Sequence, residues 1–562
     1  TVLKIGLTEG SSIPQNLVFD GRGCSFTVTS WSRFLTVSQA RNVILRDFRL
    51  TYDPKNITQG VVTRIVDASR GFYEVRIEPG YLLPDSPRFA PAQYQWAIAM
   101  RRQPDGSWGM KPGCPTTISF KGPKPPTRLG NRLYRLRFAT TMDHGRLHGA
   151  YENDPLRRVL EVNDRLALLG RTDGRGAFYA TRCHTLVYRD IEINHSPGSV
   201  FADQFSERTC YVGITVRPTG SDLFTSTADG IFTTNQRNGP WIERCQFRGI
   251  GDDAVVLKNT VGFLKATSED RERLCRIGAL KGWFSVLPGD RLAVYDMSRR
   301  ALVSQHEVAS VSSEWPWGDK DVELVPPLSV PAANDTFWIY NLSNQCNGFV
   351  LRDNTFTDHR RWGVLCSGAD GSILSNRFVR SQNAAIYLVN SDNYFDNKSG
   401  AVPRNIEIVG NRFENCWHAE NAQPFGIIAA RMNGRIEVTR GADEDISHQA
   451  GWNGIANIRI ERNHFDKWDT TARVPVENRS RELSEHPVHA IFLRNVSDVR
   501  VTGNEFIPPA RMTAGVRAIR LVNFSSVTLE NNTFRNWPGG RERAASRGAE
   551  SGGKPDAHRD AR

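Results

Sequence analysis

A short segment recurs along the chain, and it constrains the fold more than any other feature of the sequence. Each copy alternates β-branched and polar residues and then continues with Asn, Asp or Cys, one variable residue, and Phe or Ile. A repeat with this regular pattern predicts stacked structural units on one continuous core. The copies are NVILRDFRL (42–50), TLVYRDIEI (185–193), WIERCQF (241–247), GFVLRDNTF (348–356), SILSNRF (372–378), NIEIVGNRF (405–413), NIRIERNHF (457–465), DVRVTGNEF (498–506) and SVTLENNTF (526–534).

The spacing of the copies is that of the coils of a solenoid. Asn354 and Asn376 are 22 residues apart, and Asn504 and Asn532 are 28 apart. Alternation with a period of two is typical of half-buried strands. We expect each asparagine to occupy a corner in left-handed backbone and to share amide hydrogen bonds with the next coil, while the following Phe or Ile points inward and stacks. The repeat therefore predicts an all-β protein built on a right-handed parallel β-helix.

Two stretches interrupt the repeat, and both contain segments typical of small antiparallel barrels. They hold GVVTRIVDASRGFYEVRI (60–77) with VLEVNDRLALLGR (159–171), and VLPGDRLAVYD (286–296) with DVELVPPLSV (321–330). The last 22 residues lack apolar periodicity, and we expect them to be disordered. The predicted organisation is β-helix coils at 1–57, a first barrel-like insertion at 58–172, coils at 173–259, a second insertion at 260–345, coils at 346–540, and a tail at 541–562.

Composition narrows the classes of function. The nine cysteines form no CxxC pair, which argues against a structural zinc site and a disulfide framework. The net charge of +12 is spread along the chain and is not gathered in a Lys/Arg block with aromatics, so a nucleic-acid partner is not expected. An acidic or sulfated glycan remains a candidate partner, and the protein could also form a homodimer.

The chain shows no sign of a membrane-spanning segment. It has no run of about 18 uninterrupted apolar residues. It begins with TVLKIGLTEG, without Met and without a charged-then-apolar leader. We therefore expect a secreted or periplasmic protein whose signal peptide has been removed.

Three aspartates occur in two similar settings. Asp229 lies in TADGIFTTNQ (227–236), and Asp252 and Asp253 lie in GIGDDAVVLK (249–258). The 23 residues from Asp229 to Asp252 match the coil length, so the three acids are expected side by side on one exposed face, at the roughly 4.8 Å spacing of neighbouring strands. Crowding raises the pKa of at least one of the carboxyls.

Such a group suits inverting glycoside hydrolysis. One acid protonates the leaving oxygen while carboxylates about 6.5–9.5 Å away activate a water molecule. Two other interpretations are aspartates that only cap turns, and a calcium site. Calcium takes six or more oxygen ligands, and the apolar AVVL run after the doublet supplies few.

The same residues carry a resemblance to a known family. STADGIF (226–232) and ERCQFRGIGDDAVVLKNT (243–260) resemble the aspartate and Asp-Asp segments of glycoside hydrolase family 110, the β-helical α-1,3-galactosidases. RRWGVLCSGADGSILSNRF (360–378) and NAAIYLVNSDNYFDNKSGAVPRNIEIVGNRF (383–413) are similar to two further segments of that family. The resemblance covers most of residues 16–534 and is sharpest between 200 and 413.

The resemblance implies exo-acting, inverting removal of terminal α-linked galactose from an oligo- or polysaccharide, without metal or other cofactor. By position, Asp229, Asp252 and Asp253 are the implied catalytic group. The implied sugar-binding residues are Arg361, Asp392, Asn393 and Tyr394, together with Gln204 and Ser206.

This sequence also departs from the family. Lys258 and Asn259 follow the doublet where the family has a histidine-containing stretch, and Trp362 interrupts its Arg-Gly-Ile run. Lys258 could recognise a sulfate or carboxylate, so a sulfated galactose is a further candidate substrate.

Two other functions stay open. Polygalacturonases share the pattern of one Asp followed by Asp-Asp, although their Gly-His-Gly and Arg-x-Lys motifs are not found here, and they suggest an endo-hydrolase of acidic polysaccharide. The third hypothesis is a β-helix that binds glycans without catalysis. By analogy with the polygalacturonase pattern we expect Asp252 to be the general acid, with Asp229 and Asp253 holding the water.

The second insertion is expected to enclose the site. It leaves the solenoid beside Lys258 and returns one coil before Arg361. Its SSEWPWGDKD segment (312–321) places Trp315 and Trp317 on a loop, where they are expected to stack on the sugar and close one end of the groove into a pocket.

Overall fold

The computed structural model describes residues 2–537, apart from isolated positions and short gaps between 69 and 125, and apart from 7–12, 141–159, 172–175, 268–273, 280–282, 297–300, 330–336, 391–401, 417–425, 433–454, 469–470, 476–482 and 509–515. The expected tail at 541–562 lies outside the described residues. Every regular element of the described part is a β-strand. No helix in that part is long and apolar enough to cross a membrane.

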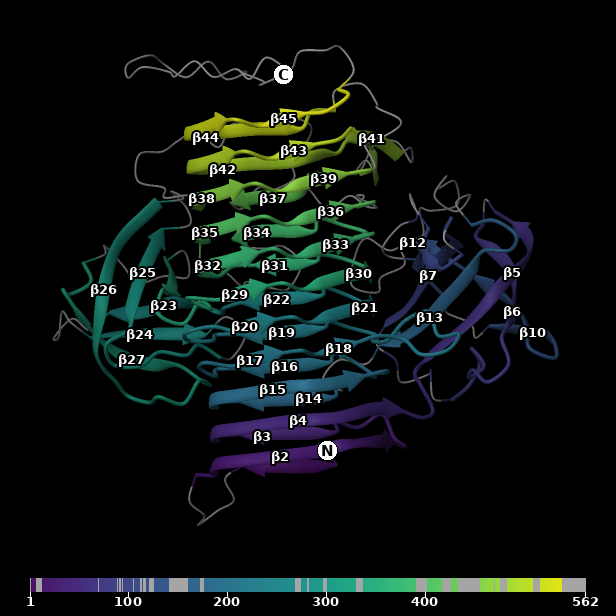
Figure 1. The fold of residues 1–562 in the computed structure, drawn as a ribbon. Coiled ribbons are helices and arrows are strands. Elements are labelled where there is room, and N and C mark those ends of the chain that lie inside the picture. Colours follow the sequence, from purple (N-terminus) through teal and green to yellow (C-terminus); the bar gives the residue numbers. More distant parts are fainter. Residues whose placement is uncertain are drawn as a thin grey trace.

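The repeat folds into a parallel solenoid of 28 strands, as predicted (Figure 1). Its strands stack in three columns, which we call faces 1, 2 and 3. Face 1 consists of β1 (Leu3–Gly6), β3 (Leu35–Ser38), β14 (Phe178–Thr181), β16 (Phe201–Gln204), β19 (Ile231–Thr234), β22 (Val255–Lys258), β31 (Val364–Cys366), β34 (Ile386–Asn390) and β37 (Gly426–Met432).

Faces 2 and 3 complete each coil. Face 2 consists of β2 (Gln15–Val28), β4 (Arg41–Tyr52), β15 (His184–Ile193), β17 (Cys210–Val212), β20 (Trp241–Glu243), β29 (Val350–Arg352), β32 (Ala369–Leu374), β35 (Arg404–Val409) and β38 (Ile455–Glu461). Face 3 consists of β18 (Thr215–Val216), β21 (Gln246–Ile250), β30 (Thr355–His359), β33 (Arg377–Val379), β36 (Arg412–Glu414), β39 (His464–Asp466), β43 (Glu505–Phe506) and β45 (Thr533–Phe534). Two long strands, β42 (His489–Thr502) and β44 (Ile519–Glu530), run through faces 1 and 2.

The asparagines and phenylalanines of the repeat form two ladders inside the solenoid. Each amide of the asparagine ladder donates to the carbonyl of the next at 2.9–3.0 Å, and the rings of the phenylalanine ladder stack with centroids 4.8–5.6 Å apart. Both stacks confirm the prediction. The ladders comprise Asn354, Asn376, Asn411, Asn463, Asn504 and Asn532, and Phe247, Phe356, Phe378, Phe413, Phe465, Phe506 and Phe534.

The corner residue differs from the expectation. The left-handed position is taken by the residue before each ladder asparagine, such as Asp353 (φ 56°), Ser375 (φ 54°) and Arg462 (φ 51°). Gly410 and Gly503 take this position in two coils, where a side chain would be strained. The ladder asparagine instead uses its amide to join neighbouring coils.

The first insertion is an antiparallel sheet of nine strands. Its described strands follow the open order β10-β11-β6-β5-β13-β7-β9-β12, with β8 paired to β7. It has its own core around Val62, Tyr73 and Leu166. The strands are β5 (Ile57–Asp67), β6 (Phe72–Ile77), β7 (Tyr94–Arg102), β8 (Trp108–Met110), β9 (Ile118–Ser119), β10 (Thr127–Gly130), β11 (Leu133–Arg137), β12 (Ala139–Thr140) and β13 (Arg165–Arg171).

The second insertion is a closed six-stranded barrel in the order β23-β24-β27-β26-β25-β28. The two insertions lie on opposite sides of the solenoid (Figure 1). A short hairpin, β40 (Thr471–Pro475) and β41 (Leu483–Pro487), lies nearer the C-terminus. The barrel strands are β23 (Val261–Thr267), β24 (Leu274–Ala279), β25 (Arg291–Asp296), β26 (Ala301–Val311), β27 (Lys320–Val325) and β28 (Phe337–Asn341).

The cysteines behave as small apolar side chains. All nine are free thiols, and seven of them are buried. Cys24 is exposed and Cys210 is half-buried.

Candidate active site

The three aspartates meet at the start of two neighbouring strands of face 1. β19 and β22 pair with Ile231 opposite Val255, which places Asp229 in register with Asp253 and not with Asp252. One carboxylate oxygen from each of the three aspartates lies within 4.8 Å of the others. Their expected exposure is wrong, because all three are buried (6% exposed for Asp229, 2% for Asp252 and 3% for Asp253).

Glycine allows the coils to approach closely here. A Cβ atom on Gly251 would lie 2.5 Å from the carbonyl oxygen of Ser226 and 2.7 Å from the carbonyl carbon of Thr227. Both contacts are to backbone, which cannot move aside easily. Only glycine therefore fits immediately before the Asp252–Asp253 doublet.

Asp252 is surrounded by three arginines. Arg171, the last residue of β13 in the first insertion, donates to Oδ2. Arg360 and Arg361, which follow β30, approach Oδ1 at 3.1 and 3.2 Å. Burial by itself would raise the pKa of Asp252, but the guanidinium groups of Arg361, Arg171 and Arg360 outweigh it and hold the pKa well below the usual range. Asp252 is therefore ionised.

Asp253 has the opposite environment. Its Oδ1 accepts a hydrogen bond from the Trp362 backbone N–H at 3.2 Å, and the Nε atom of Arg361 is 3.9 Å away. Burial raises the pKa of Asp253 to about 7, and the negative charges of Asp252 and Asp229 add to this effect against the opposing charge of Arg361. Asp253 therefore holds its proton below about pH 7.

Asp229 shares part of this environment. Its Oδ2 accepts from the hydroxyl of Ser199 at 3.0 Å, and its Oδ1 accepts from the Asp253 backbone N–H at 3.3 Å. Burial, followed by the charge of Asp252, raises the pKa of Asp229. The general-acid role expected of Asp252 does not agree with this arrangement, because the proton belongs to Asp253 or Asp229.

Lys258 ends β22 and contributes a fourth positive charge. Its Nζ lies 5.9 Å from the ring centroid of Phe232. Burial lowers the pKa of Lys258, while Asp253 and Asp229 act to raise it. The four cationic side chains thus already exceed the negative charge of the three aspartates. A divalent cation would bring like charge into this cluster, which argues against the calcium reading.

The structure places the other predicted residues in different surroundings. Gln204, on face 1, accepts from the hydroxyl of Tyr179 at 3.1 Å. Ser206 is buried and accepts from the Cys183 backbone N–H at 3.1 Å, which is a structural contact. The predicted sugar-binding residues Asp392, Asn393 and Tyr394 lie outside the described residues.

The two tryptophans do not meet the aspartates. Trp317 packs on Phe205, with ring centroids 5.8 Å apart. Phe205 follows Gln204, and Gln204 pairs with Thr234 of β19. Phe205 is therefore level with Asn235, which is six residues after Asp229 along the chain. At about 3.3 Å per residue this is roughly 20 Å from Asp229. Instead, the first insertion contributes Arg171, which contacts Asp252.

Sequence reasoning missed Arg171 and Arg360. Arg171 is 81 residues from Asp252 and reaches it only through the placement of the first insertion, so no local pattern marks it. Arg360 stands beside the predicted Arg361, and this Arg-Arg pair was the available signal. Arg360 is also fixed by its Nε–H, which donates to the Gly251 carbonyl at 2.6 Å, and by the Trp96 ring 5.1 Å away.

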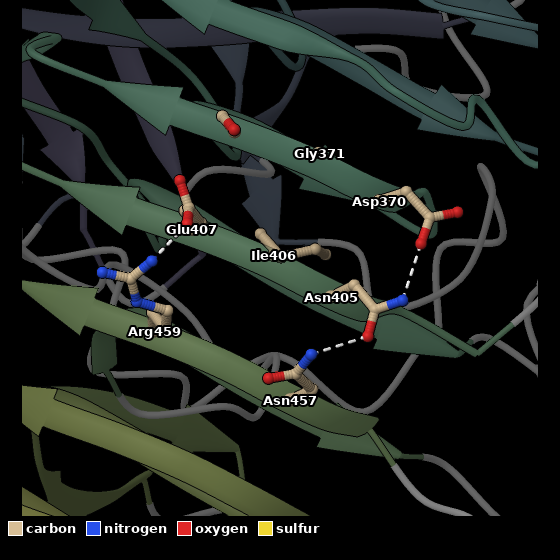
Figure 2. Close-up of a pocket in the computed structure, with 8 residues that line it drawn as sticks. Asp370, Gly371, Asn405, Ile406, Glu407, Asn457 and Arg459 are labelled. Carbon is tan, nitrogen blue, oxygen red and sulfur yellow. Dashed lines mark hydrogen bonds and ion pairs between the residues drawn. The ribbon is translucent and has the colours of Figure 1, made fainter.

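A polar depression lies on face 2, over β32, β35 and β38, away from the aspartates (Figure 2). Its side chains are paired with one another. Asn405 donates to Asp370 at 2.6 Å, Asn457 donates to Asn405 at 2.8 Å, and Arg459 pairs with Glu407. This pairing is a surface ladder between coils, and we assign it no role in binding.

Fold and site together define a parallel β-helix protein with a buried carboxylate–guanidinium cluster. No protein-family model matches the sequence, and no curated protein matches it. Among solved structures, PfbA, a surface adhesin of Streptococcus pneumoniae, is 11% identical with a TM-score of 0.30, over 65% of this chain and 63% of that one. The chain thus spans less than two thirds of that adhesin structure.

Two further solved structures are of glycoside hydrolases. The catalytic unit of a GH87 α-1,3-glucanase from Streptomyces thermodiastaticus is 10% identical, with a TM-score of 0.29 over 86% of this chain and 91% of that one. A family 28 exopolygalacturonase of Yersinia enterocolitica is 9% identical, with a TM-score of 0.24 over 92% of this chain and 72% of that one. At these low scores the similarities carry no argument about activity.

Proposed function

We propose that the protein is a glycoside hydrolase whose general acid is Asp253. The observation that carries this proposal is the difference in pKa between the members of the aspartate cluster. Asp252 is held ionised by three arginines, while Asp229 and Asp253 have raised pKa values less than 5 Å away. Neighbouring carboxyls whose pKa values are pushed apart supply the acid and base that glycoside hydrolysis requires.

In this proposal Asp253 gives its proton to the glycosidic oxygen as the bond to the sugar breaks. Because Asp229 and Asp253 lie side by side, a proton on Asp253 favours the ionised form of Asp229. The ionised Asp229, which accepts a hydrogen bond from the Ser199 hydroxyl, takes a proton from the attacking water. Asp252 keeps its charge and orients Arg361, whose guanidinium contacts both members of the doublet.

The substrate that we propose is a terminal α-linked galactose, α-1,3-linked and with or without sulfate, removed from the end of an oligo- or polysaccharide by a secreted or periplasmic enzyme. The support for galactose is the family resemblance of the segments around Asp229 and Asp252. The resemblance implies inversion. The spacing of the carboxylate oxygens, no more than 4.8 Å, is shorter than the gap of about 6.5–9.5 Å associated with inversion. The resemblance and this spacing therefore disagree on inversion, and the anomer of the first product decides between inversion and retention.

Proton NMR of the first product formed from an α-1,3-galactosyl oligosaccharide tests the substrate and the stereochemistry of this proposal. β-Galactose as the first anomer is the expected result, and α-galactose would show retention. Internal fragments from polygalacturonate would favour the endo-hydrolase of acidic polysaccharide. Glycan binding without any hydrolysis would favour a non-catalytic protein.

Replacing the acid gives the matching variant test. Asp253→Asn should lower kcat by about a hundredfold or more. A suitable control is Asp203→Asn, since Asp203 is also buried and its pKa is raised by burial to about 6, but it bonds Thr209 and Gln236 inside the solenoid. If both variants lose activity equally, the loss reflects general disturbance of the fold.

A further inference from the structure

A row of aromatic and cationic side chains leads away from the aspartates along the outer surface of face 1. Along β14 and β16 buried residues alternate with half-buried ones, so Tyr179 and Gln204 point outward. The register places Tyr179, Ala202 and Phe232 in one row across the strands. Thr181, Gln204 and Thr234 form the next row, and Lys258 extends it.

Each cation in this region rests on an aromatic ring. Lys258 lies 5.9 Å from the Phe232 centroid, nearest to the aspartates. Arg33 lies 4.3 Å over the ring of Tyr179. Arg182, which follows β14, lies 4.3 Å over the ring of Trp315. Stacking on a ring holds a cationic side chain in a fixed orientation.

The far end of the row is a fixed platform on the barrel. Trp315 and Trp317 lie in the hairpin loop between β26 and β27, with ring centroids 5.0 Å apart, and they are 48% and 39% exposed. The hairpin is held from below by Lys320, which is buried and donates to the carbonyls of both tryptophans. Two exposed rings on a rigid loop are a feature of binding surfaces more than of a core.

We propose that a polysaccharide chain bearing anionic groups lies along this row, with its terminal sugar at the aspartates and its following sugars on face 1 as far as the Trp315–Trp317 platform. This inference deepens the proposed function and rests on it for the position of the terminal sugar. The first insertion supplies Arg171 to the cluster, and the barrel lies on the other side of the solenoid, so we place the following sugars toward the barrel. Phe232, Tyr179 and the two tryptophans offer ring faces to the sugars.

The anionic nature of the chain follows from the charges. Lys258, Arg33 and Arg182 are spaced along the row, and the acid that acts on Arg182 is the exposed Glu314 of the hairpin. Sulfate and carboxylate groups both match a guanidinium through paired hydrogen bonds. The shared requirement is therefore a negatively charged sugar.

Calorimetric binding to the Asp253→Asn protein tests the proposal without hydrolysis of the ligand. The ligands are an oligosaccharide of a sulfated galactan, the same oligosaccharide after chemical desulfation, and a polygalacturonate of equal length. The sulfated ligand should bind at least about tenfold more tightly than the desulfated one. Tighter binding of polygalacturonate than of the sulfated ligand would identify carboxylate as the anion.

Two variants localise the binding. Trp315→Ala with Trp317→Ala should weaken binding of all three ligands about tenfold, whereas Arg182→Gln should weaken only the charged ones. Trp241→Ala is the matched control, because Trp241 is also 39% exposed and lies beneath Arg352 at 5.5 Å, but on face 2. It should bind like the parent protein.

The outcomes separate this proposal from the proposed function. Unchanged binding in the Trp315→Ala/Trp317→Ala variant, or equal binding of sulfated and desulfated ligands, would overturn the anionic row. Binding that follows the expected pattern in a protein whose native form hydrolyses none of the ligands would leave the row standing and overturn the hydrolase.

Discussion

The Nη2 atom of Arg360 lies 3.1 Å from Oδ1 of Asp252, and both side chains are almost completely buried, at 2% and 3% exposure. The pair joins the coil of β22 to the coil of β31. It also meets the first insertion, because the Arg360 guanidinium packs on the ring of Trp96. The ion pair therefore connects the stability of the solenoid, the docking of the insertion and the charge of the candidate active site.

Breaking this pair should be costly. Arg360→Met removes one partner and leaves a buried charge with less compensation, so the free energy of unfolding should fall by about 3–5 kcal/mol. The urea midpoint measures this effect. The comparison is Arg46→Met, since Arg46 and Asp20 form an exposed pair at 37% and 29% side-chain exposure, where a loss of about 1 kcal/mol or less is expected. Equal losses would contradict the structural role of Arg360.

The activity should decline as the pH rises through about 7. Catalysis in our proposal requires protonated Asp253, whose pKa is raised to about 7. Because Arg361 opposes this rise, Arg361→Gln should move the alkaline limb of kcat/KM to higher pH. An unchanged limb in this variant would show that another group is responsible for it.

Stability should depend on pH with the corresponding sign. Asp253 binds its proton more tightly in the folded state than in the unfolded state, so its contribution is complete below the ordinary aspartate pKa of 3.8 and is lost as the pH rises through about 7. Asp252 acts in the opposite sense, because its pKa is lowered on folding. The urea midpoint of the native protein should therefore fall between about pH 4 and 7. In the Asp253→Asn variant this fall should be smaller.

Chelation should leave the proposed hydrolase activity unaffected. Arg171, Arg360, Arg361 and Lys258 already surround the aspartate cluster, so a divalent cation would meet repulsion there. Activity after EDTA treatment and the Tm with and without added Ca²⁺ measure this. Loss of activity that calcium restores would favour a metal site at the aspartates.

The buried asparagine ladder should contribute more to the free energy of unfolding than the exposed ladder on the surface of the solenoid. Asn411→Ala removes the acceptor of the Asn376 backbone N–H and of one of its two amide bonds, and it also removes the donor to the Ile373 carbonyl. We therefore expect a loss of about 1–3 kcal/mol in unfolding free energy. Asn457→Ala removes a similar amide–amide bond in the exposed ladder of Figure 2 and should cost less than about 1 kcal/mol. Similar costs would show that burial of the ladder is unimportant.

The sequence by itself determined the solenoid and the gathering of the aspartates. Alternation with a period of two and a repeat of 22 to 28 residues are local patterns, and they specify which side chains face the core and which coils stack. Asp229 and the Asp252–Asp253 doublet meet because they are one coil apart in such a stack. The barrel was likewise recognisable from its strand segments.

Only the tertiary structure decided the chemistry within the cluster. The protonation of an aspartate depends on burial and on charges within a few ångströms, and Arg171 comes from an insertion 81 residues away. The position of Trp315 and Trp317 depended on how the barrel packs against the ends of β14 and β16. No residue pattern in the hairpin encodes this packing. Repeats dictate contacts along the solenoid, whereas the docking of an insertion results from surfaces that are far apart in sequence.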